Sequence, residues 1–209
     1  MKNLEIAACQ NLIVLYGTLS DDFDQGLKSL AQELGFTDIT RISTIDVPVE
    51  EWVLLKCQYG CPNYGKRFIC PPYSPEPSRT RAIIGEYTTA FLLRYDVPGY
   101  NREADMQITQ DGVTAAWDAF LRLERYAFLN GRHKAFVFGL NHCPGCDVCG
   151  AESGRTSCKY PQIARPSLEA CGINVRGLVE AAGWSGRLRG QNVLKGDDTV
   201  SMISMLLLE

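Results

Sequence analysis

The chain has 209 residues, of which 45% are hydrophobic and 22% charged, and this composition suits a single globular domain over residues 1–209. Its 21 basic and 24 acidic residues give a formal net charge of −3, so the charge balance favours neither nucleic acid nor an anionic membrane surface as a partner. No segment has the length and apolarity of a signal peptide or a membrane span, and we expect a cytoplasmic protein.

Apolar residues alternate between a helical period and short strand-like runs along the chain. Helices are predicted over residues 23–34, 75–87, 111–130 and 174–182. Strands are predicted over residues 12–16, 38–47, 52–55, 90–95, 135–140 and 200–208. In the third helix, Trp117, Phe120 and Phe128 are expected to pack in the core. The order predicts an α/β fold with a central sheet and flanking helices, but it does not set the order or direction of the strands.

Nine cysteines are the unusual feature of the composition. In a reducing compartment, closely spaced cysteines indicate metal binding or redox chemistry rather than disulfides. Most of them fall in two loops, residues 57–72 and 143–161, which we expect to form a metal-binding lobe.

The second of these loops has the more specific spacing. It reads Cys143-Pro-Gly-Cys146-Asp-Val-Cys149, with Cys158 nine positions further on. Cysteines at successive x2 spacings are typical of a loop that wraps an iron–sulfur cube. Structural zinc sites usually take their four ligands as two separated pairs. The spacing therefore predicts a [4Fe–4S] cluster, with a zinc site or four free cysteines as the alternatives.

The first loop offers three thiols, from Cys57, Cys61 and Cys70, without a close fourth. A cube held by three cysteines leaves one iron open to water, to a substrate or to another ligand, and such an iron can act as a Lewis acid. Alternatively, these cysteines complete one metal site shared with the second loop, or they form a zinc site with a cysteine from elsewhere.

Two further cysteines lie outside these loops. Cys171 would bring the number of ligands to eight, enough for two complete cubes, and either Cys158 or Cys171 could serve the cluster of the first loop. The alternative for Cys171 is a small buried apolar residue near the end of a helix. Cys9 is isolated and is expected in the core.

Three segments together resemble an uncharacterised prokaryotic family whose members are described only as predicted metal-binding proteins. The segments are the first cysteine loop, the second cysteine loop, and Arg165-Pro-Ser-Leu-Glu-Ala-Cys171-Gly-Ile-Asn-Val. The resemblance covers most of the chain from Asp38 onward. It implies metal binding through these cysteines and implies no reaction.

These observations leave three classes of function open. The first is an electron carrier or redox partner that binds one or two [4Fe–4S] clusters and acts on another protein. The second is an enzyme whose open iron, near Cys57, Cys61 and Cys70, binds a small substrate. The third and most distant is a structural zinc protein. Whether Cys171 is a ligand discriminates between the first two.

The spatial relation of the two loops is a further hypothesis. Each loop follows a predicted strand, residues 52–55 for the first and residues 135–140 for the second. If these strands are parallel neighbours, both loops leave the same edge of the sheet, where sites of open α/β sheets gather. Arg165 is expected to pair either with the charge of a cluster or with a carboxylate.

Overall fold

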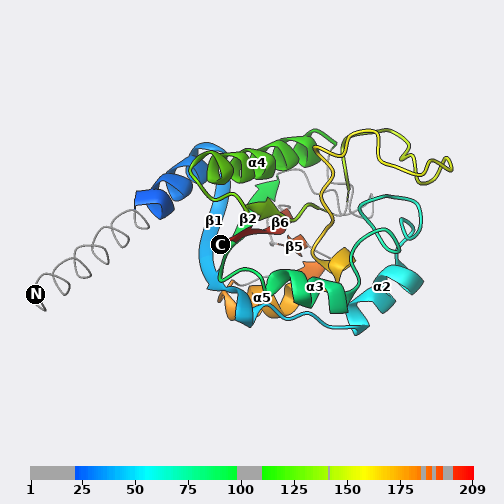
Figure 1. The fold of residues 1–209 in the computed structure, drawn as a ribbon, viewed down its shortest axis with the longest axis horizontal. Coiled ribbons are helices and arrows are strands. Elements are labelled where there is room, and N and C mark those ends of the chain that lie inside the picture. The colour runs from blue at the N-terminus through cyan, green and yellow to red at the C-terminus, as the bar shows by residue number, and fades with distance from the viewer. Residues whose placement is uncertain (1–21, 98–109, 141, 185–186, 190–191, 195–199) are drawn as a thin grey trace, which may run out of the picture.

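The computed structural model describes residues 22–97, 110–140, 142–184, 187–189, 192–194 and 200–209. Cys9 and the strand predicted over residues 12–16 lie outside the described residues. Figure 1 shows a sheet in the middle of the molecule, helices on both of its faces, and the two cysteine loops together at one end.

The sheet is antiparallel in every pair of strands that the structure describes. Its strands are β1 (Phe36–Ser43), β2 (Thr89–Val97), β3 (Phe136–Val137), β4 (Arg187–Arg189), β5 (Asn192–Leu194) and β6 (Val200–Leu208). They follow the order β1-β2-β6-β5-β4, and β3 also pairs with β6. The strands predicted over residues 90–95 and 200–208 are confirmed as β2 and β6, and β6 is buried along its whole length.

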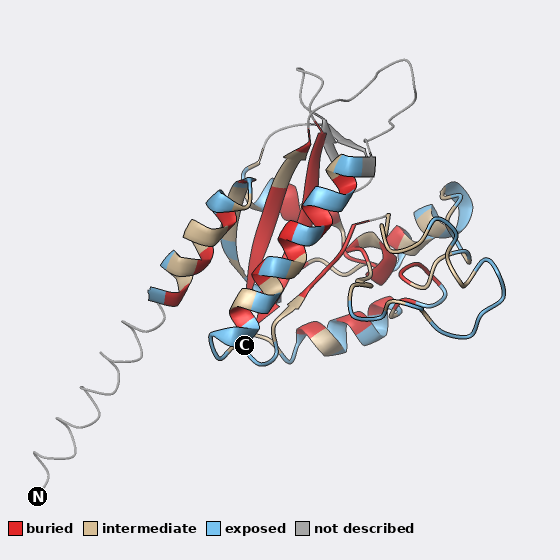
Figure 2. Cartoon of the chain, turned by 90° about the horizontal axis from the view of Figure 1, so that it is seen from above, coloured by how far each residue is buried: buried red, intermediate tan, exposed pale blue. Residues whose placement is uncertain are grey.

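Alternate residues of the central strands enter two separate cores. Phe91 and Leu93 of β2 face the helix over residues 22–33 and α4 (Gln110–Leu129). Ala90 and Leu92 face α5 (Val175–Ala181) and the end of α3 (Pro77–Ile84). Figure 2 shows the buried sides of these elements turned toward the sheet. The fold is therefore a mixed α/β sandwich with three layers.

The four predicted helices are confirmed, with one exception in the buried face of α4. Trp117 and Phe120 lie in the core as expected, whereas Phe128 is 57% exposed. The buried stripe continues instead through Leu123 and Ala127. The expectation for Phe128 was wrong because this residue lies beside the buried stripe in the last turn of α4, next to the exposed Leu129.

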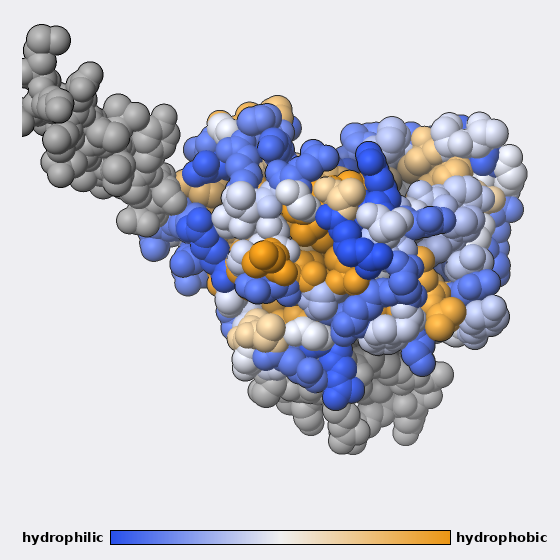
Figure 3. Space-filling view, turned by 60° about the horizontal axis from the view of Figure 1, so that its bottom comes forward, coloured by the Kyte–Doolittle hydropathy of each residue, from blue (hydrophilic) through white to orange (hydrophobic). Residues whose placement is uncertain are grey.

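The segment before the first cysteine loop is helical, so the strand predicted over residues 52–55 was wrong. This segment begins α2 (Trp52–Gly60), and Val53 is its only buried residue. A run of four apolar residues resembles a strand, but here Trp52, Leu55 and Tyr59 recur at helical spacing on the exposed side. Figure 3, which views the molecule from the side of α2, α3 and α5, shows separate apolar patches among polar side chains.

The hypothesis of two parallel strands was therefore also wrong. The first loop leaves a helix, and the strand predicted over residues 135–140 is the short β3, which pairs antiparallel with β6. The C-terminal strand β6 lies between β2 and β3 and pairs antiparallel with both of them. Among the helices that the structure describes, none is long and apolar enough to cross a bilayer.

Candidate metal centre

The four cysteines of the second loop surround one small cavity of about 20 Å³. Cys143, Cys146, Cys149 and Cys158 all line it. Aromatic and aliphatic side chains complete the wall and keep the cavity largely apolar: Phe68, Ile69, Tyr160 and Ala164. Four thiols facing one enclosed space form a donor set for a thiophilic metal or cluster.

Backbone amides support the thiols of this second site. The N–H of Tyr160 donates to Sγ of Cys158 at 3.4 Å. Burial raises the pKa of the Cys143 thiol, and the N–H of Gly145, which donates to its sulfur, opposes that rise. A Cβ atom at Gly145 would lie 3.1 Å from Cδ1 of Ile163 and 3.5 Å from Sγ of Cys143, so the glycine lets the turn close around the sulfur. Such N–H···S bonds help to tune the potential of iron–sulfur groups.

The chain returning from the second loop is fixed to α4. Trp117 Nε1 donates to the carbonyl oxygen of Ile163 at 2.9 Å. The guanidinium of Arg165 forms two hydrogen bonds with the carboxylate of Glu124, one of them at 2.9 Å, and both side chains are mostly buried. Arg165 therefore pairs with a carboxylate, which was one of the two expectations for this residue. These contacts hold the base of the loop against the sheet core.

The first cysteine site is built at the end of α2. Cys57 lies in the last turn of the helix, and Cys61 caps it, with its N–H donating to the carbonyl oxygen of Cys57 at 3.3 Å. A series of turns then brings Cys70 back, and the three side chains line one cavity of about 230 Å³. Burial raises the pKa of the Cys57 thiol to about 11 and that of the Cys70 thiol to about 12.

Glu169 lines the same cavity, and the sequence analysis missed it. It opens a 3₁₀ turn, η3 (Glu169–Cys171), and its carbonyl oxygen accepts a weak bond from the Cys57 thiol at 3.9 Å. Burial of its carboxyl group raises the pKa of Glu169 to about 8. The signal in the sequence was an acidic residue within the apolar segment Leu168–Val175, two positions before the cysteine that drew attention.

Cys171 belongs to the same 3₁₀ turn but faces the core, although, in addition to burial, the charges of Cys57 and Cys70 still contribute to its raised pKa. Its side chain is only 1% exposed, and it packs in the core between the sheet and α5. Burial raises the pKa of its thiol to about 12. It is not among the residues that line either cysteine cavity.

The two cysteine sites share a wall, the segment Arg67–Pro71. Phe68 and Ile69 line the second cavity, whereas Cys70 and Pro71 line the first. The charge of Cys149, from the second loop, contributes to the raised pKa of Cys70 after burial and the neighbouring cysteines Cys61 and Cys57. The two loops thus lie against each other, and one continuous segment contributes to the walls of both cavities.

Polar residues near the sites have structural partners. Nζ of Lys66 lies 4.0 Å from Oε1 of Glu152, which links the exposed sides of the two loops. Burial, followed by the charge of Arg67, lowers the pKa of His142. His133, ten positions before Cys143 in the chain, pairs with Glu209, with 2.8 Å between Nδ1 and Oε1.

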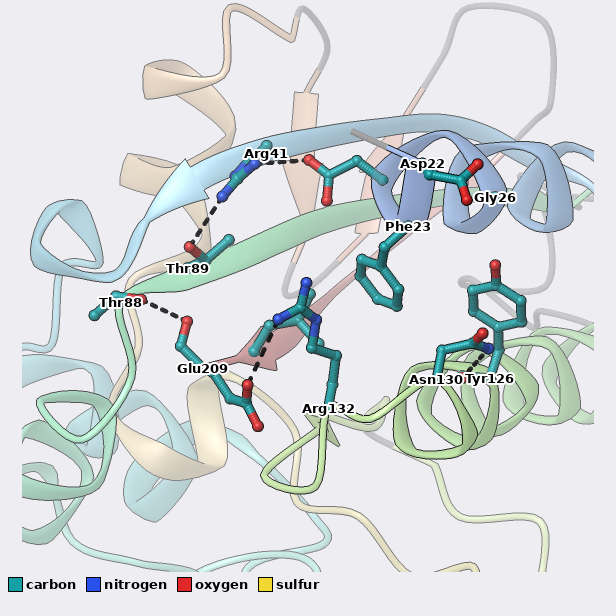
Figure 4. A pocket seen from close by; sticks show the side chains of 12 residues that line it. Asp22, Phe23, Gly26, Arg41, Thr88, Thr89, Tyr126, Asn130, Arg132 and Glu209 are labelled. Carbon is teal, nitrogen blue, oxygen red and sulfur yellow. Dashed lines mark hydrogen bonds and ion pairs between the residues drawn. The ribbon is translucent and has the colours of Figure 1, made fainter. Parts of the chain in front are cut away.

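A larger cavity, of about 680 Å³, lies between the helix over residues 22–33, the end of α4 and the edge of the sheet. Figure 4 shows two ion pairs among its charged side chains, which also include Asp22. Arg41 contacts Asp24 at 2.7 Å, and Arg132 contacts Glu209 at 3.6 Å while stacking over the ring of Phe23. It contains no cysteine, so its chemistry differs from that of the two cysteine sites.

The eight cysteines that the structure describes are all free of disulfide bonds. Within the described part of the chain, no three His, Cys, Asp or Glu side chains converge closely enough to bind one common metal ion. The cysteines of each group stand around the walls of a cavity instead.

Comparison with known proteins identifies the family. A family model described as predicted metal-binding protein (DUF2284) matches residues 40–208, so the chain belongs to this family. Neither the comparison with curated proteins nor that with solved structures gave a match.

Proposed function

We propose that this member of a predicted metal-binding family is an iron–sulfur protein that holds two [4Fe–4S] clusters and transfers electrons. Cys143, Cys146, Cys149 and Cys158 would hold one cluster. The loop 57–72, through Cys57, Cys61 and Cys70, would hold the other.

The observation that supports this proposal most directly is the shared wall between the two groups of thiols. The segment Arg67–Pro71 contributes to the walls of both the first and the second cavity. Clusters held on both sides of this segment would exchange electrons, which is the chemistry that such groups supply. The donor set has the chemistry of this group, because seven thiols face two cavities and amide N–H groups point at the sulfurs of Cys143 and Cys158, and the second cavity, of about 20 Å³, would widen to admit a cube.

The protein's own residues would position the thiols and exclude water. Phe68, Ile69 and Ala164 form the apolar wall of the second cavity. The i, i+4 spacing of Cys57 and Cys61 at the end of α2 places both thiols on one side of the helix end. The electrons would pass to or from a redox partner protein.

A second function is favoured by the larger cavity at the first site. Three thiols line this cavity of about 230 Å³, together with Lys56 and Tyr64. A small substrate could bind there at an iron without a thiolate ligand, and the protein would then be an enzyme.

Metal analysis tests the proposal. We expect protein isolated without oxygen to contain about eight iron and about eight sulfide per chain, as two [4Fe–4S] clusters require. After reduction, electron paramagnetic resonance should show two interacting clusters. The Cys146→Ser variant should lose about half of the iron and the interaction, while Ser153→Ala, in the exposed part of the same loop, should retain both.

Two outcomes would contradict the proposal. One is stoichiometric zinc without sulfide, which would indicate a structural zinc protein. The other is an unchanged spectrum of the first cluster in Cys146→Ser, because loss of a neighbouring cluster must remove the interaction. Cyanide is also added to the reduced protein: a changed spectrum shows an iron with a replaceable ligand, which the enzyme requires and the electron carrier does not, and an unchanged spectrum favours the electron carrier.

A further inference from the structure

Four residues with acidic side chains line the cavity of the first cysteine site. Cys57, Cys61 and Cys70 carry thiols, and Glu169 carries a carboxyl group whose charge contributes, after burial, to the raised pKa of Cys57. A [4Fe–4S] cube has four irons, and each needs one ligand from outside the cube. Three thiolates therefore leave one corner for another donor, which the first site must find within the cavity.

The geometry of η3 decides which residue of this turn faces the cavity. A 3₁₀ helix has three residues per turn, so residues two positions apart point to different sides. Glu169 lines the cavity, whereas Cys171 packs in the core beside Ile173 and Val175.

Two hydrogen bonds keep the turn in this orientation. The hydroxyl of Ser74 donates to the carbonyl oxygen of Ala170 at 2.6 Å, and the N–H of Ala170 donates to Oγ of Ser167 at 3.2 Å. Both bonds are buried, so rotating Cys171 toward the cavity would leave buried polar groups without partners. The turn therefore presents Glu169 and withholds Cys171.

No basic side chain forms an ion pair with Glu169 among the residues that the structure describes, although Lys56 lines the same cavity. Glu169 is half-buried, and burial raises the pKa of its carboxyl group. A carboxylate removed from water in this way is costly unless a cation or a metal pairs with it. A metal group bound by the three neighbouring thiols would supply that positive partner.

We propose that the Glu169 carboxylate is the fourth protein ligand of the group held by Cys57, Cys61 and Cys70. The inference rests on the proposed function, since it assumes an iron–sulfur cluster at the first site. A carboxylate oxygen donates an electron pair to the remaining iron and displaces a water molecule, and any proton on the carboxyl group passes to solvent. No electron is gained or lost. Because carboxylate is a harder ligand than thiolate, an incoming cyanide or thiol can replace it at this iron.

Mössbauer spectroscopy of protein enriched in ⁵⁷Fe tests the inference. In the unmodified protein, about one eighth of the iron should show oxygen ligation, because one of the irons of two [4Fe–4S] clusters differs from the rest. Glu169→Cys should convert this component to sulfur ligation without loss of iron. Glu169→Ala should tighten cyanide binding at least tenfold, because no protein ligand then competes. Cys171→Ala and Glu152→Ala, which changes an exposed carboxylate of the second loop, should leave the spectrum unchanged.

The opposite results would overturn the inference. If all iron has sulfur ligation in the unmodified protein, or if Cys171→Ala removes iron from the first site while both Glu169 variants keep the original spectrum, Cys171 is the ligand and Glu169 is not. Circular dichroism and thermal melting check that the variants are folded, and Glu169→Cys retains a ligand in case Glu169→Ala loses its cluster. If Glu169 is not a ligand but the protein still contains its iron and sulfide, the inference fails and the proposed function stands. Protein without iron and sulfide would refute both the inference and the proposed function.

Discussion

The sheet core and the cysteine lobe, which we define as residues 61–74 and 142–164, are stabilised by different interactions. In the core, apolar side chains of β2 and β6 are buried on both faces of the sheet. In the lobe, the chain runs through turns, and much of the second loop is exposed, as Figure 2 shows. Its contacts are backbone hydrogen bonds, the thiols around two cavities, the ion pair of Lys66 with Glu152, and a small number of apolar contacts, such as those of Ile69 with the edge of the core.

This difference indicates that the core and the lobe are stabilised by different contributions to the free energy of folding. Burial of apolar area stabilises the core without any metal. The lobe has few apolar contacts of its own, so its free energy depends on what the thiols bind. Three predictions test this division, from the largest expected effect to the smallest.

The largest effect is expected in the core, at Phe120. This side chain is 1% exposed and stacks edge-on against Phe36, 5.2 Å between ring centroids. Phe120→Ala should lower the free energy of unfolding by about 3–5 kcal/mol, through lost burial and a cavity. Urea denaturation of the metal-free protein measures this change in the free energy of unfolding.

Phe128→Ala is the matched control on the same helix. Because Phe128 is exposed, its loss should change the free energy of unfolding by no more than about 0.5 kcal/mol. Similar effects of the two substitutions would show that α4 does not pack on the sheet as described.

An intermediate effect is expected where the lobe joins the core, at Arg165. Its removal leaves the mostly buried carboxylate of Glu124 without its cation, and we expect a loss of about 1–3 kcal/mol. Because the pair holds the base of the second loop, iron should also be lost faster to a chelator from this variant. Arg176→Ala breaks an exposed pair with Glu180 and should cost no more than about 0.5 kcal/mol, with iron loss unchanged. Equal rates of iron loss would contradict the anchoring role.

The smallest effect is expected in the core when metal is removed. A chelator under reducing conditions should change the free energy of unfolding of the core by less than about 1 kcal/mol, since no metal is needed for its apolar burial. Trypsin should cut the metal-free protein faster after Arg155, which lies in the exposed tip of the second loop. A core that unfolds together with metal loss would remove the distinction between the two regions.

The sequence predicted the elements whose burial follows a simple period. The apolar runs of β2 and β6 and the stripe of α4 were recognised because a strand or helix buried on the sheet leaves a clear pattern. Residues 52–55 were misread, since α2 packs through one residue, Val53, and keeps apolar side chains on its exposed side. The spacing of Cys57 and Cys61, four positions apart, was the better indicator of a helix.

The candidate site was predicted in part for a related reason. Spacing along the chain grouped the cysteines of each loop, because neighbours in a tight loop stay neighbours in space. It contained no information on Glu169, which reaches the first cavity through a turn more than a hundred residues away. It also left Cys171 ambiguous, because a ligand and a buried core thiol look alike until the direction of η3 is known.

The segment Arg67–Pro71 has a consequence for how much this protein can vary in length. Phe68 and Ile69 line the second cavity, whereas Cys70 and Pro71 line the first. The cavity that the segment lines therefore changes between the adjacent residues Ile69 and Cys70. Inserting or deleting a single residue here would turn an apolar side chain toward the thiols of the first site and move Cys70 out of it. Most surface loops accept such changes, as the tip around Gly154 should, where open space surrounds the chain. The wall between the two sites should therefore keep its number of residues in every functional relative, even where the residues themselves differ.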